Sequence, residues 1–193
     1  MKLIIATGNQ NKVREMREIL TGHEVLSQAE AGILCDVEET GTTFEENAVL
    51  KASQICRLCN LPTIADDSGI VVDALGGAPG IYSARYAGEH ATDEDRNKKL
   101  LDALKNVPDA QRTGRFVCAI AIVFPDGETH TFRGECEGLI ARAPKGGHGF
   151  GYDPLFYYPP FGCTLGEADP AQKNKVSHRY RALQKLDAFL RGR

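Results

Sequence analysis

The sequence lacks the features that mark several large classes of protein. No apolar run approaches membrane-spanning length, and the apolar run within residues 1–6 is too short for a signal peptide. The 23 Lys and Arg residues are outnumbered by 26 Asp and Glu residues, so no general basic field exists for binding nucleic acid through its phosphates. Internal repeats, linkers and low-complexity segments are also absent. We therefore expect a cytoplasmic protein that binds neither membrane nor nucleic acid and holds any anionic ligand with local groups.

What is present suits an ordinary globular protein. The chain has 193 residues, of which 42% are hydrophobic and 25% are charged. A chain of this length buries roughly 70% of its unfolded surface, so it needs neither a metal nor a disulfide to fold. We expect a single domain over residues 1–193, built either as one large domain or as two lobes that share a core.

The six cysteines suit a reduced, packed interior. Cys56 and Cys59 form a Cys-x-x-Cys pair, but no second pair follows at zinc-finger spacing. Both lie on the apolar face of a predicted helix, beside Ala52 and Ile55. Without a secretion signal the thiols are expected to stay reduced, and we interpret the pair as core packing.

The N-terminal part predicts a strand and two helices. An apolar strand is expected at residues 2–6, and the polar segment Thr7–Lys12 leads from it into an amphipathic helix. Residues 24–37 have the pattern of an irregular strand region. A capping box at residues 43–46 predicts a helix that begins there and reaches about residue 59.

The remainder of the chain predicts a mixed sheet. Residues 115–124 are apolar on both faces, which is typical of a central strand. A turn at residues 125–128 joins this strand to another at 129–137, giving an antiparallel hairpin. Thr92 is expected to cap a helix that reaches about residue 105. Because helical crossovers accompany the hairpin, we predict an α/β fold with a long curved mixed β-sheet, flanking helices and two lobes.

An acidic pair is the first candidate for chemistry. Residues 61–65 have the pattern of a short apolar strand and residues 70–75 that of another, so Asp66 and Asp67 are predicted to lie in a turn between them. Acids at a strand end in an open α/β sheet are placed to hold a metal or activate a water. A solvated turn with two ordinary acids is the alternative, since turns favour these residue types.

The polar turn Thr7–Lys12 is the second candidate. Free amides at a helix start bind anions, and Lys12 adds a full positive charge in the first turn. The turn lacks Walker A spacing, so a phosphate loop and a plain connection both fit. Glu38 and Glu39 precede another helix start, where a carboxylate either favours the helix dipole or joins the acidic pair as a metal ligand.

The third candidate combines a glycine-rich loop with a helix start. The loop Gly146–Pro154 contains aromatic residues, and its glycines let the backbone approach a ligand closely. Phe150 or Tyr152 could stack on a planar base. His178 and Arg179 fall in the first turn of the last predicted helix. Because cations there oppose the helix dipole, ligand contact explains this pair better than helix stability does.

Together, five motifs resemble the inosine triphosphatase family, whose members destroy ITP, dITP and XTP. The motifs are Thr-Gly-Asn-x-x-Lys at Thr7–Lys12, Thr-Phe-x-Glu-Asn-Ala at Thr43–Ala48, Ala-Asp-Asp-Ser-Gly at Ala65–Gly69, Phe-Gly-Tyr-Asp-Pro at Phe150–Pro154 and Ser-His-Arg at Ser177–Arg179. Each motif alone is weak, but the five in order are specific and span nearly the whole chain. The resemblance implies a nucleotide cleft between two lobes, a Mg²⁺ requirement and a homodimer.

The resemblance also implies roles for single residues. Asp67 matches the family's proton acceptor and metal ligand, and Glu39 resembles the second metal carboxylate when aligned through Thr40-Gly41. Some family members carry Trp at the position of Tyr152, which we expect to change fit rather than function. The residues that match the family's nucleotide contacts are Thr7, Gly8, Asn9, Gln10, Asn11, Lys12, Ser68, Phe150, Gly151, Tyr152, Asp153, Lys173, His178 and Arg179.

The implied reaction is hydrolysis of a non-standard purine nucleoside triphosphate to the monophosphate and pyrophosphate, which would prevent misincorporation into DNA and RNA. Mg²⁺ and Lys12 would neutralise the phosphates, while Asp67 deprotonates the attacking water. Asp66 is expected to support the metal's ligands from behind. One alternative is a pyrophosphatase for other modified nucleotides. Another is a nucleotide-binding regulatory domain without turnover, against which the intact Asp67 and Glu39 argue.

Overall fold

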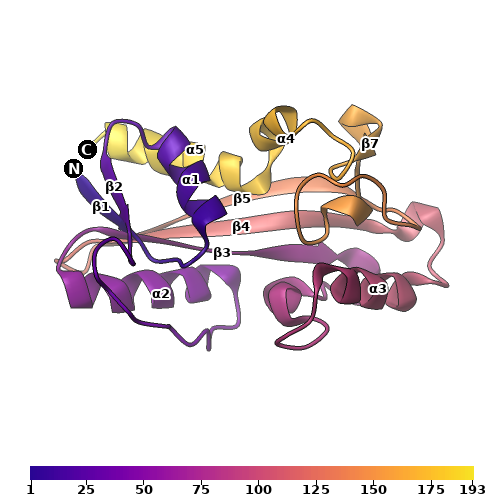
Figure 1. The fold of residues 1–193 in the computed structure, drawn as a ribbon, viewed down its shortest axis with the longest axis horizontal. Coiled ribbons are helices and arrows are strands. Elements are labelled where there is room, and N and C mark those ends of the chain that lie inside the picture. The colour runs from indigo at the N-terminus through magenta and orange to yellow at the C-terminus, as the bar shows by residue number, and fades with distance from the viewer. The chain divides into compact units, whose positions relative to one another are not determined.

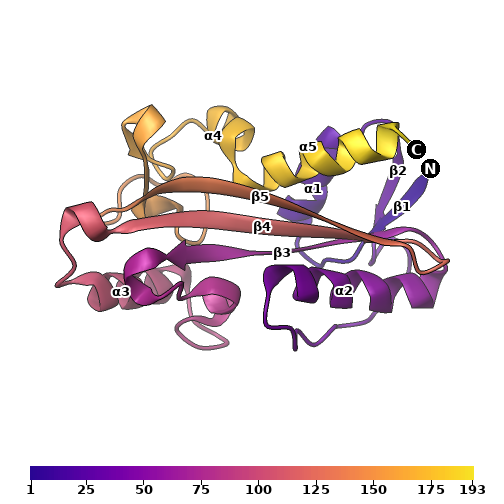
Figure 2. The same cartoon turned by 180° about the vertical axis from the view of Figure 1, so that it is seen from behind.

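A mixed β-sheet runs through the computed structural model, which describes residues 1–193 (Figures 1 and 2). Its strands are β1 (Lys2–Ile5), β2 (Glu24–Ser27), β3 (Thr63–Val72), β4 (Thr113–Val123), β5 (Thr129–Ile140), β6 (Phe156–Tyr158) and β7 (Cys163–Thr164). The order across the seven-stranded sheet is β2-β1-β3-β4-β5-β6-β7. β1 pairs in parallel with β2 and β3, whereas β6 pairs antiparallel with β5 and β7. The predicted mixed α/β fold is therefore confirmed.

The helices begin where their capping residues predict. They are α1 (Gln10–Ile19), α2 (Phe44–Cys59), α3 (Asp93–Leu104), α4 (Pro170–Val176) and α5 (His178–Arg191). The hydroxyls of Thr43 and Thr92 each accept a hydrogen bond from a first-turn backbone N–H, and both capping boxes are complete. No helix is both long enough and apolar enough to cross a membrane.

The chain divides into two compact units, in agreement with the prediction of two lobes. Unit 1 comprises residues 1–67, 118–134 and 179–193, and unit 2 comprises residues 68–117 and 135–178. Strands β3, β4 and β5 each contribute residues to both units. The two units are described separately below.

Unit 1 has a hydrophobic cluster on each face of its sheet. Successive residues of a strand point to opposite faces, so Leu3 and Ile5 of β1 pack in a cluster with α1 and α5. Ile4 and Ala6 pack in the other cluster, with α2. The views from both sides show α1 and α5 on one face of these strands and α2 on the other (Figures 1 and 2). We call these the α1/α5 face and the α2 face.

The cysteine pair lies in the second of these clusters. Cys56 is buried among the α2 residues of the cluster, and the partly buried Cys59 packs against it. All six cysteines are free thiols. The interpretation of Cys56 and Cys59 as core residues is confirmed.

Unit 2 packs around a single cluster. Ile70 and Val72 of β3, Leu100 and Leu104 of α3, and Phe156 of β6 are buried together. These contacts fix α3 and the connections around β6 against the sheet, and the loop Gly146–Tyr152 precedes β6 in this unit.

The predicted turn at Asp66 and Asp67 is wrong, because β3 runs without interruption through both residues. The turn-favouring Ser68 and Gly69 are part of the strand, and Gly69 is there for close packing. A Cβ atom at Gly69 would lie 2.4 Å from both the carbonyl oxygen of Gly80 and the hydroxyl of Ser83. Tertiary packing thus makes residues 66–69 part of a strand, whereas their propensities alone favour a turn.

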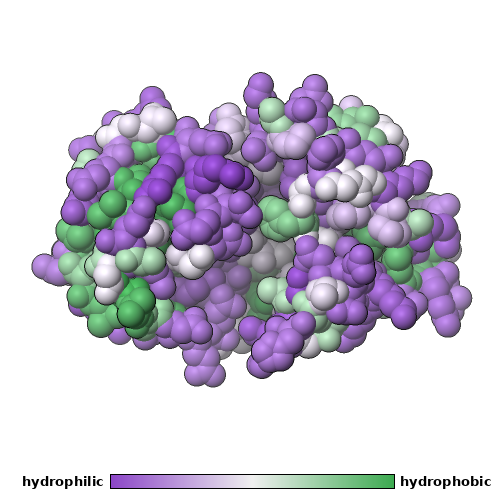
Figure 3. Space-filling model, in the orientation of Figure 1, coloured by the Kyte–Doolittle hydropathy of each residue, from purple (hydrophilic) through white to green (hydrophobic).

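The predicted strand region at residues 24–37 is also shorter than expected. Only β2 forms a strand, and the chain from residue 28 to the start of α2 carries no regular element. Leu34 in this segment is 96% exposed. In the space-filling view apolar residues of unit 1 gather beside α1, while hydrophilic residues cover α1 itself (Figure 3).

Candidate active site

The adjacent carboxylates Asp66 and Asp67 point to opposite faces of β3. Ile64 packs on the α1/α5 face and Ala65 on the α2 face, and the alternation continues through the acidic pair. Asp66 accordingly contacts residues of α1, β4 and α5, whereas Asp67 contacts residues of α2. The two acids therefore have different hydrogen-bond partners.

Asp66 is an acceptor for two cations. Its Oδ1 atom accepts a hydrogen bond from Lys12 Nζ at 3.0 Å, and its Oδ2 atom accepts one from Arg179 Nε at 3.3 Å. The thiol of Cys118 lies 4.0 Å from the same Oδ2 atom. Burial opposes ionisation, but Lys12 and Arg179 outweigh it and hold the pKa of Asp66 well below its usual range. Asp66 is thus a buried anion that organises positive charge.

This finding corrects the role expected for Asp66. The sequence predicted that Asp66 supports the metal's ligands from behind Asp67, but its carboxylate lies on the opposite face and is bonded to Lys12 and Arg179. The period of two along a β-strand is the reason, since neighbours in an extended strand cannot share a face.

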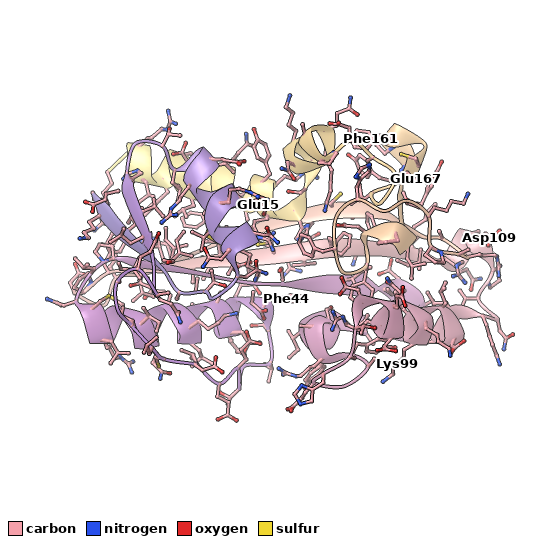
Figure 4. All side chains as sticks on the ribbon, viewed as in Figure 1. Glu15, Phe44, Lys99, Asp109, Phe161 and Glu167 are labelled. Atoms are coloured by element: carbon pink, nitrogen blue, oxygen red, sulfur yellow. The ribbon has the colours of Figure 1, made fainter.

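Arg179 is itself buried between two acids. Its side chain is 4% exposed, and Nη1 donates to Glu15 Oε2 at 2.7 Å while Nε donates to Asp66. Glu15 projects from α1 (Figure 4). Through these bonds Arg179 joins α5 to α1 and to β3. A role for Arg179 in contacting the base stays a prediction.

Asp67 is held by α2. Asn47 Nδ2 donates to Asp67 Oδ2 at 3.0 Å, and Lys51 Nζ lies 3.8 Å from Asp67 Oδ1. Burial raises the pKa of Asp67 above its ordinary value, with further increase from the like charges of Glu39 and Asp66, although Lys51 and Asn47 act in the opposite direction. A carboxylate in this setting is a stronger base than an exposed Asp.

Glu39 shares a lysine with Asp67. Lys51 Nζ lies 2.6 Å from Glu39 Oε1, so one ammonium group contacts both carboxylates that the family resemblance assigns to a metal. Glu38, the alternative metal ligand, is exposed. The backbone N–H of Gly41 donates to Asn47 Oδ1 at 2.8 Å, which ties the segment carrying Glu39 to α2.

These two acids suit Mg²⁺ in kind and number. Nowhere do three or more His, Cys, Asp or Glu side chains gather in a way that could hold a metal ion. Magnesium in phosphate-handling enzymes is commonly bound by one or two carboxylates, with waters and substrate phosphates as the other ligands. The shared ammonium shows that Glu39 and Asp67 converge on one cation position.

The turn Thr7–Lys12 is organised by Asn9. Its side-chain oxygen accepts hydrogen bonds from the backbone N–H groups of Asn11 at 3.0 Å and Lys12 at 3.4 Å, so Asn9 caps α1. The hydroxyl of Thr7 accepts from the Asn9 N–H. Residues 8–11 are exposed. Phosphate binding by Thr7, Gly8, Asn9, Gln10, Asn11 and Lys12 stays a prediction, and an anion at these amides would compete with the Asn9 cap.

In unit 2, Asp153 organises the glycine-rich loop. Its buried carboxylate accepts a hydrogen bond from the Phe150 N–H at 2.9 Å and pairs with Lys173 of α4. Lys173 Nζ also lies 4.9 Å from the centre of the Phe150 ring. Phe150 is 47% exposed. Its ring is therefore held beside a cation with one side accessible for stacking.

Gly151 and Tyr152 of the same loop are held by hydrogen bonds to other segments of unit 2. Tyr152 is buried, and its hydroxyl donates to the Ser83 carbonyl at 2.8 Å, so Phe150 is the exposed ring of the two proposed to stack. The Gly151 peptide is held on both sides, because Asp93 accepts its N–H and Asn97 donates to its carbonyl.

The other two predicted contacts in unit 2 are His178 and Ser68. The His178 ring stacks on Phe116, with ring centres 5.0 Å apart and an angle of 16° between planes. Ser68 is half-buried in β3, one residue after Asp67. Nucleotide contact by either residue stays a prediction.

Sequence reasoning missed several residues that hold the site together. Asn47 belongs to the motif Thr43–Ala48, and Lys51 lies three residues after it. Their i, i+4 spacing on α2 indicates that they share a face of the helix. That signal was present in the sequence. Glu15, Asp93 and Asn97 act through contacts between segments far apart in the chain, which no local pattern reveals.

These observations define a class of protein. It is an α/β protein in which one strand carries a cation-bound carboxylate on one face and a second carboxylate, with a raised pKa, on the opposite face. Residues 3–189 match the model of the Ham1 family, and the chain belongs to this family. This result confirms the resemblance to the inosine triphosphatases, because matching relatives carry the corresponding pyrophosphatase name.

Relatives and solved structures agree over nearly the full length. The chain is 51% identical to the dITP/XTP pyrophosphatase of Vibrio cholerae, covering 96% of this chain and 94% of the relative. It is similar to the structure of the Staphylococcus aureus Ham1 protein, with a TM-score of 0.93, 45% identity and coverage of 100% and 99%. A HAM1 protein from Coxiella burnetii gives a TM-score of 0.95, 42% identity and full coverage of both chains.

Proposed function

We propose that this protein hydrolyses the non-standard purine nucleoside triphosphates ITP, dITP and XTP to the monophosphate and pyrophosphate, and so keeps them out of DNA and RNA. The convergence of Glu39 and Asp67 on one cation position is the observation that carries the proposal. The family membership and the names of the relatives support the substrate class.

In this proposal Glu39 and Asp67 would hold Mg²⁺. Bound Mg²⁺ would supply positive charge to balance the phosphates of the substrate. Asp67 accepts a proton from the water that attacks the α phosphorus, and its raised pKa suits that role. Asn47 keeps the Asp67 carboxylate oriented while the proton is transferred.

Lys12 and the turn Thr7–Lys12 bind the phosphate tail. Lys12 Nζ is already fixed by Asp66, so its charge is positioned before the substrate arrives. The grip on the tail makes nucleoside diphosphates poor substrates, since they offer fewer phosphate oxygens to these groups.

The base is recognised by His178, Arg179 and Phe150. Hypoxanthine and xanthine present an oxygen at C6, which accepts hydrogen bonds, whereas adenine presents an amino group there and would leave donors unpaired. Stacking on Phe150 adds affinity without choosing among purines. Guanine also has the C6 oxygen, so it is excluded less completely. We further propose that the protein is cytoplasmic and forms a homodimer.

A panel of nucleoside triphosphates with chromatographic identification of products tests this function. We expect Mg²⁺-dependent turnover of ITP, dITP and XTP, with monophosphate and pyrophosphate as the primary products. ATP should be hydrolysed far more slowly. Orthophosphate as the primary product would contradict attack at the α phosphorus, and tight binding without turnover would favour a regulatory nucleotide-binding domain.

A further inference from the structure

Lys51 occupies the position on which the two proposed metal ligands converge. Its Nζ atom lies 2.6 Å from Glu39 Oε1 and 3.8 Å from Asp67 Oδ1, and its side chain is 15% exposed. We propose that Lys51 is a built-in counter-ion that holds the place of the divalent metal and keeps the free protein's affinity for that metal low. This inference rests on the proposed metal ligands Glu39 and Asp67.

The ammonium group contacts both proposed metal ligands. Its two carboxylate partners come from separate segments, since Glu39 precedes α2 and Asp67 lies in β3. Lys51 is therefore a full cation with anionic partners on more than one side. A metal that enters the site must first separate this ammonium from Glu39 and Asp67.

Asp67 and the segment that carries Glu39 also have a partner other than the ammonium. Asn47 donates to Asp67 from the rigid α2 helix, and its own oxygen accepts the Gly41 N–H from the segment that carries Glu39. Asn47 is fully buried, and its bond to Asp67 is buried as well. Asp67 and the backbone near Glu39 are thus tied to α2 by contacts that do not involve Lys51.

The arrangement favours joint arrival of metal and nucleotide. With Lys51 bound, Glu39 and Asp67 together with the ammonium carry a net charge of about −1, which attracts a free divalent ion weakly. A metal–triphosphate complex brings further ligands for the metal, and its phosphates offer the displaced ammonium a new anionic partner. The free protein would then bind little metal at concentrations where the metal–nucleotide complex binds well.

Binding of Mn²⁺ without nucleotide tests this inference. Free Mn²⁺ is measured by electron paramagnetic resonance during titration of the full-length wild type and of Lys51→Met, Lys51→Arg and Lys185→Met. We expect Lys51→Met to bind Mn²⁺ at least about tenfold more tightly, because two facing carboxylates are left without a cation. Lys51→Arg keeps the charge and should bind as weakly as the wild type. Lys185 is exposed and donates to the Arg133 carbonyl, so Lys185→Met is the control for loss of a lysine from unit 1.

Two outcomes separate failure of this inference from failure of the proposed metal site. If Lys51→Met binds Mn²⁺ no more tightly than the wild type, Lys51 does not compete with metal and the inference is overturned. If the double variant Lys51→Met, Asp67→Asn binds Mn²⁺ as well as Lys51→Met does, the metal is elsewhere and the proposed ligands are wrong.

A second measurement keeps the inference testable if Lys51→Met folds poorly in the absence of metal. The melting temperature is recorded against Mg²⁺ concentration for Lys51→Met and Lys185→Met, since a ligand that binds only the folded state raises it. We expect a larger Mg²⁺-induced rise for Lys51→Met. Equal rises in the two variants would overturn the inference.

Discussion

The two faces of strand β3 shift the pKa of an aspartate in opposite directions. On the α1/α5 face, Asp66 is 2% exposed and both of its oxygens accept hydrogen bonds from cations. On the α2 face, Asp67 accepts a hydrogen bond from the neutral amide of Asn47 and shares the lysine of Glu39. The pKa is lowered on the first face and raised on the second. A shift of one residue along a strand is enough to place two neighbouring acids in opposite electrostatic environments.

The comparison shows what each environment can do. Asp66 is locked as an anion, so it positions Lys12 and Arg179 but cannot accept a proton at neutral pH. At Asp67 the effect of burial outweighs that of Lys51 and Asn47, so its pKa is raised and it accepts a proton more readily than Asp66 does. The acidic pair therefore positions two cations on one face, and on the other it carries the carboxylate that we propose as the general base.

The largest expected effect comes from Asp67→Asn. The variant should keep its fold and lose at least about 100-fold in turnover, the usual scale for removal of a general base. Pyrophosphate release from ITP at saturating Mg²⁺ measures the loss, and circular dichroism checks the fold. Near-normal turnover would break the comparison by showing that the α2 face does not supply the base.

A smaller effect is expected from Lys12→Met, on the other face. Loss of a charge-assisted contact to the phosphates should raise KM for ITP by about tenfold to a hundredfold, with a lesser change in kcat. Lys2→Met is the control, because Lys2 forms an exposed ion pair with Glu24. An unchanged KM would mean that the turn Thr7–Lys12 is a plain connection.

The pH dependence of stability should report the locked state of Asp66. Its pKa in the folded protein lies below the ordinary value of 3.8, so its stabilising contribution is complete above that pH and is lost as the pH falls below it. The difference in unfolding free energy between the wild type and Asp66→Asn should be constant above about pH 5 and shrink below about pH 4. Urea unfolding across this range measures the difference. Growth of the difference on acidification would contradict the sign assigned to Asp66.

The smallest effect is expected from the α2 cysteines, which share a face with Asp67. The double variant Cys56→Ala, Cys59→Ala should lose about 1 to 2 kcal/mol of unfolding free energy through lost packing, with turnover near that of the wild type. Metal analysis of both proteins is the second readout. Stoichiometric zinc in the wild type that is missing from the double variant would contradict the core interpretation.

Much of the fold follows from local patterns in the sequence. The capping boxes at Thr43 and Thr92 place two helix starts, because each satisfies backbone donors within a few residues. The apolar faces of β4 predict its central position in the sheet. These elements are decided by interactions that are short in sequence or by a strong hydrophobic pattern.

Local sequence patterns could not predict that β3 is continuous, or which residues contact its two acids. Asp, Ser and Gly favour turns, but Gly69 is selected by the close approach of Gly80 and Ser83, which lie later in the chain. Arg179 reaches Asp66 across 113 positions of sequence. Contacts of this kind depend on how the chain folds back on itself, and motif resemblance located the acids without revealing that they face opposite ways.

The unfolding free energies of Asp66→Asn and Asp67→Asn, measured side by side in urea with chelator at neutral pH, test the central claim most directly. Asp66→Asn leaves the buried Arg179 and its neighbour Lys12 without their shared anion, so we expect a loss of about 3 to 5 kcal/mol. Asp67→Asn removes a charge that burial disfavours, and the Asn oxygen can still accept from Asn47. Its stability should be unchanged or higher. Equal losses in the two variants, or a greater loss in Asp67→Asn, would contradict the division of roles between the two faces.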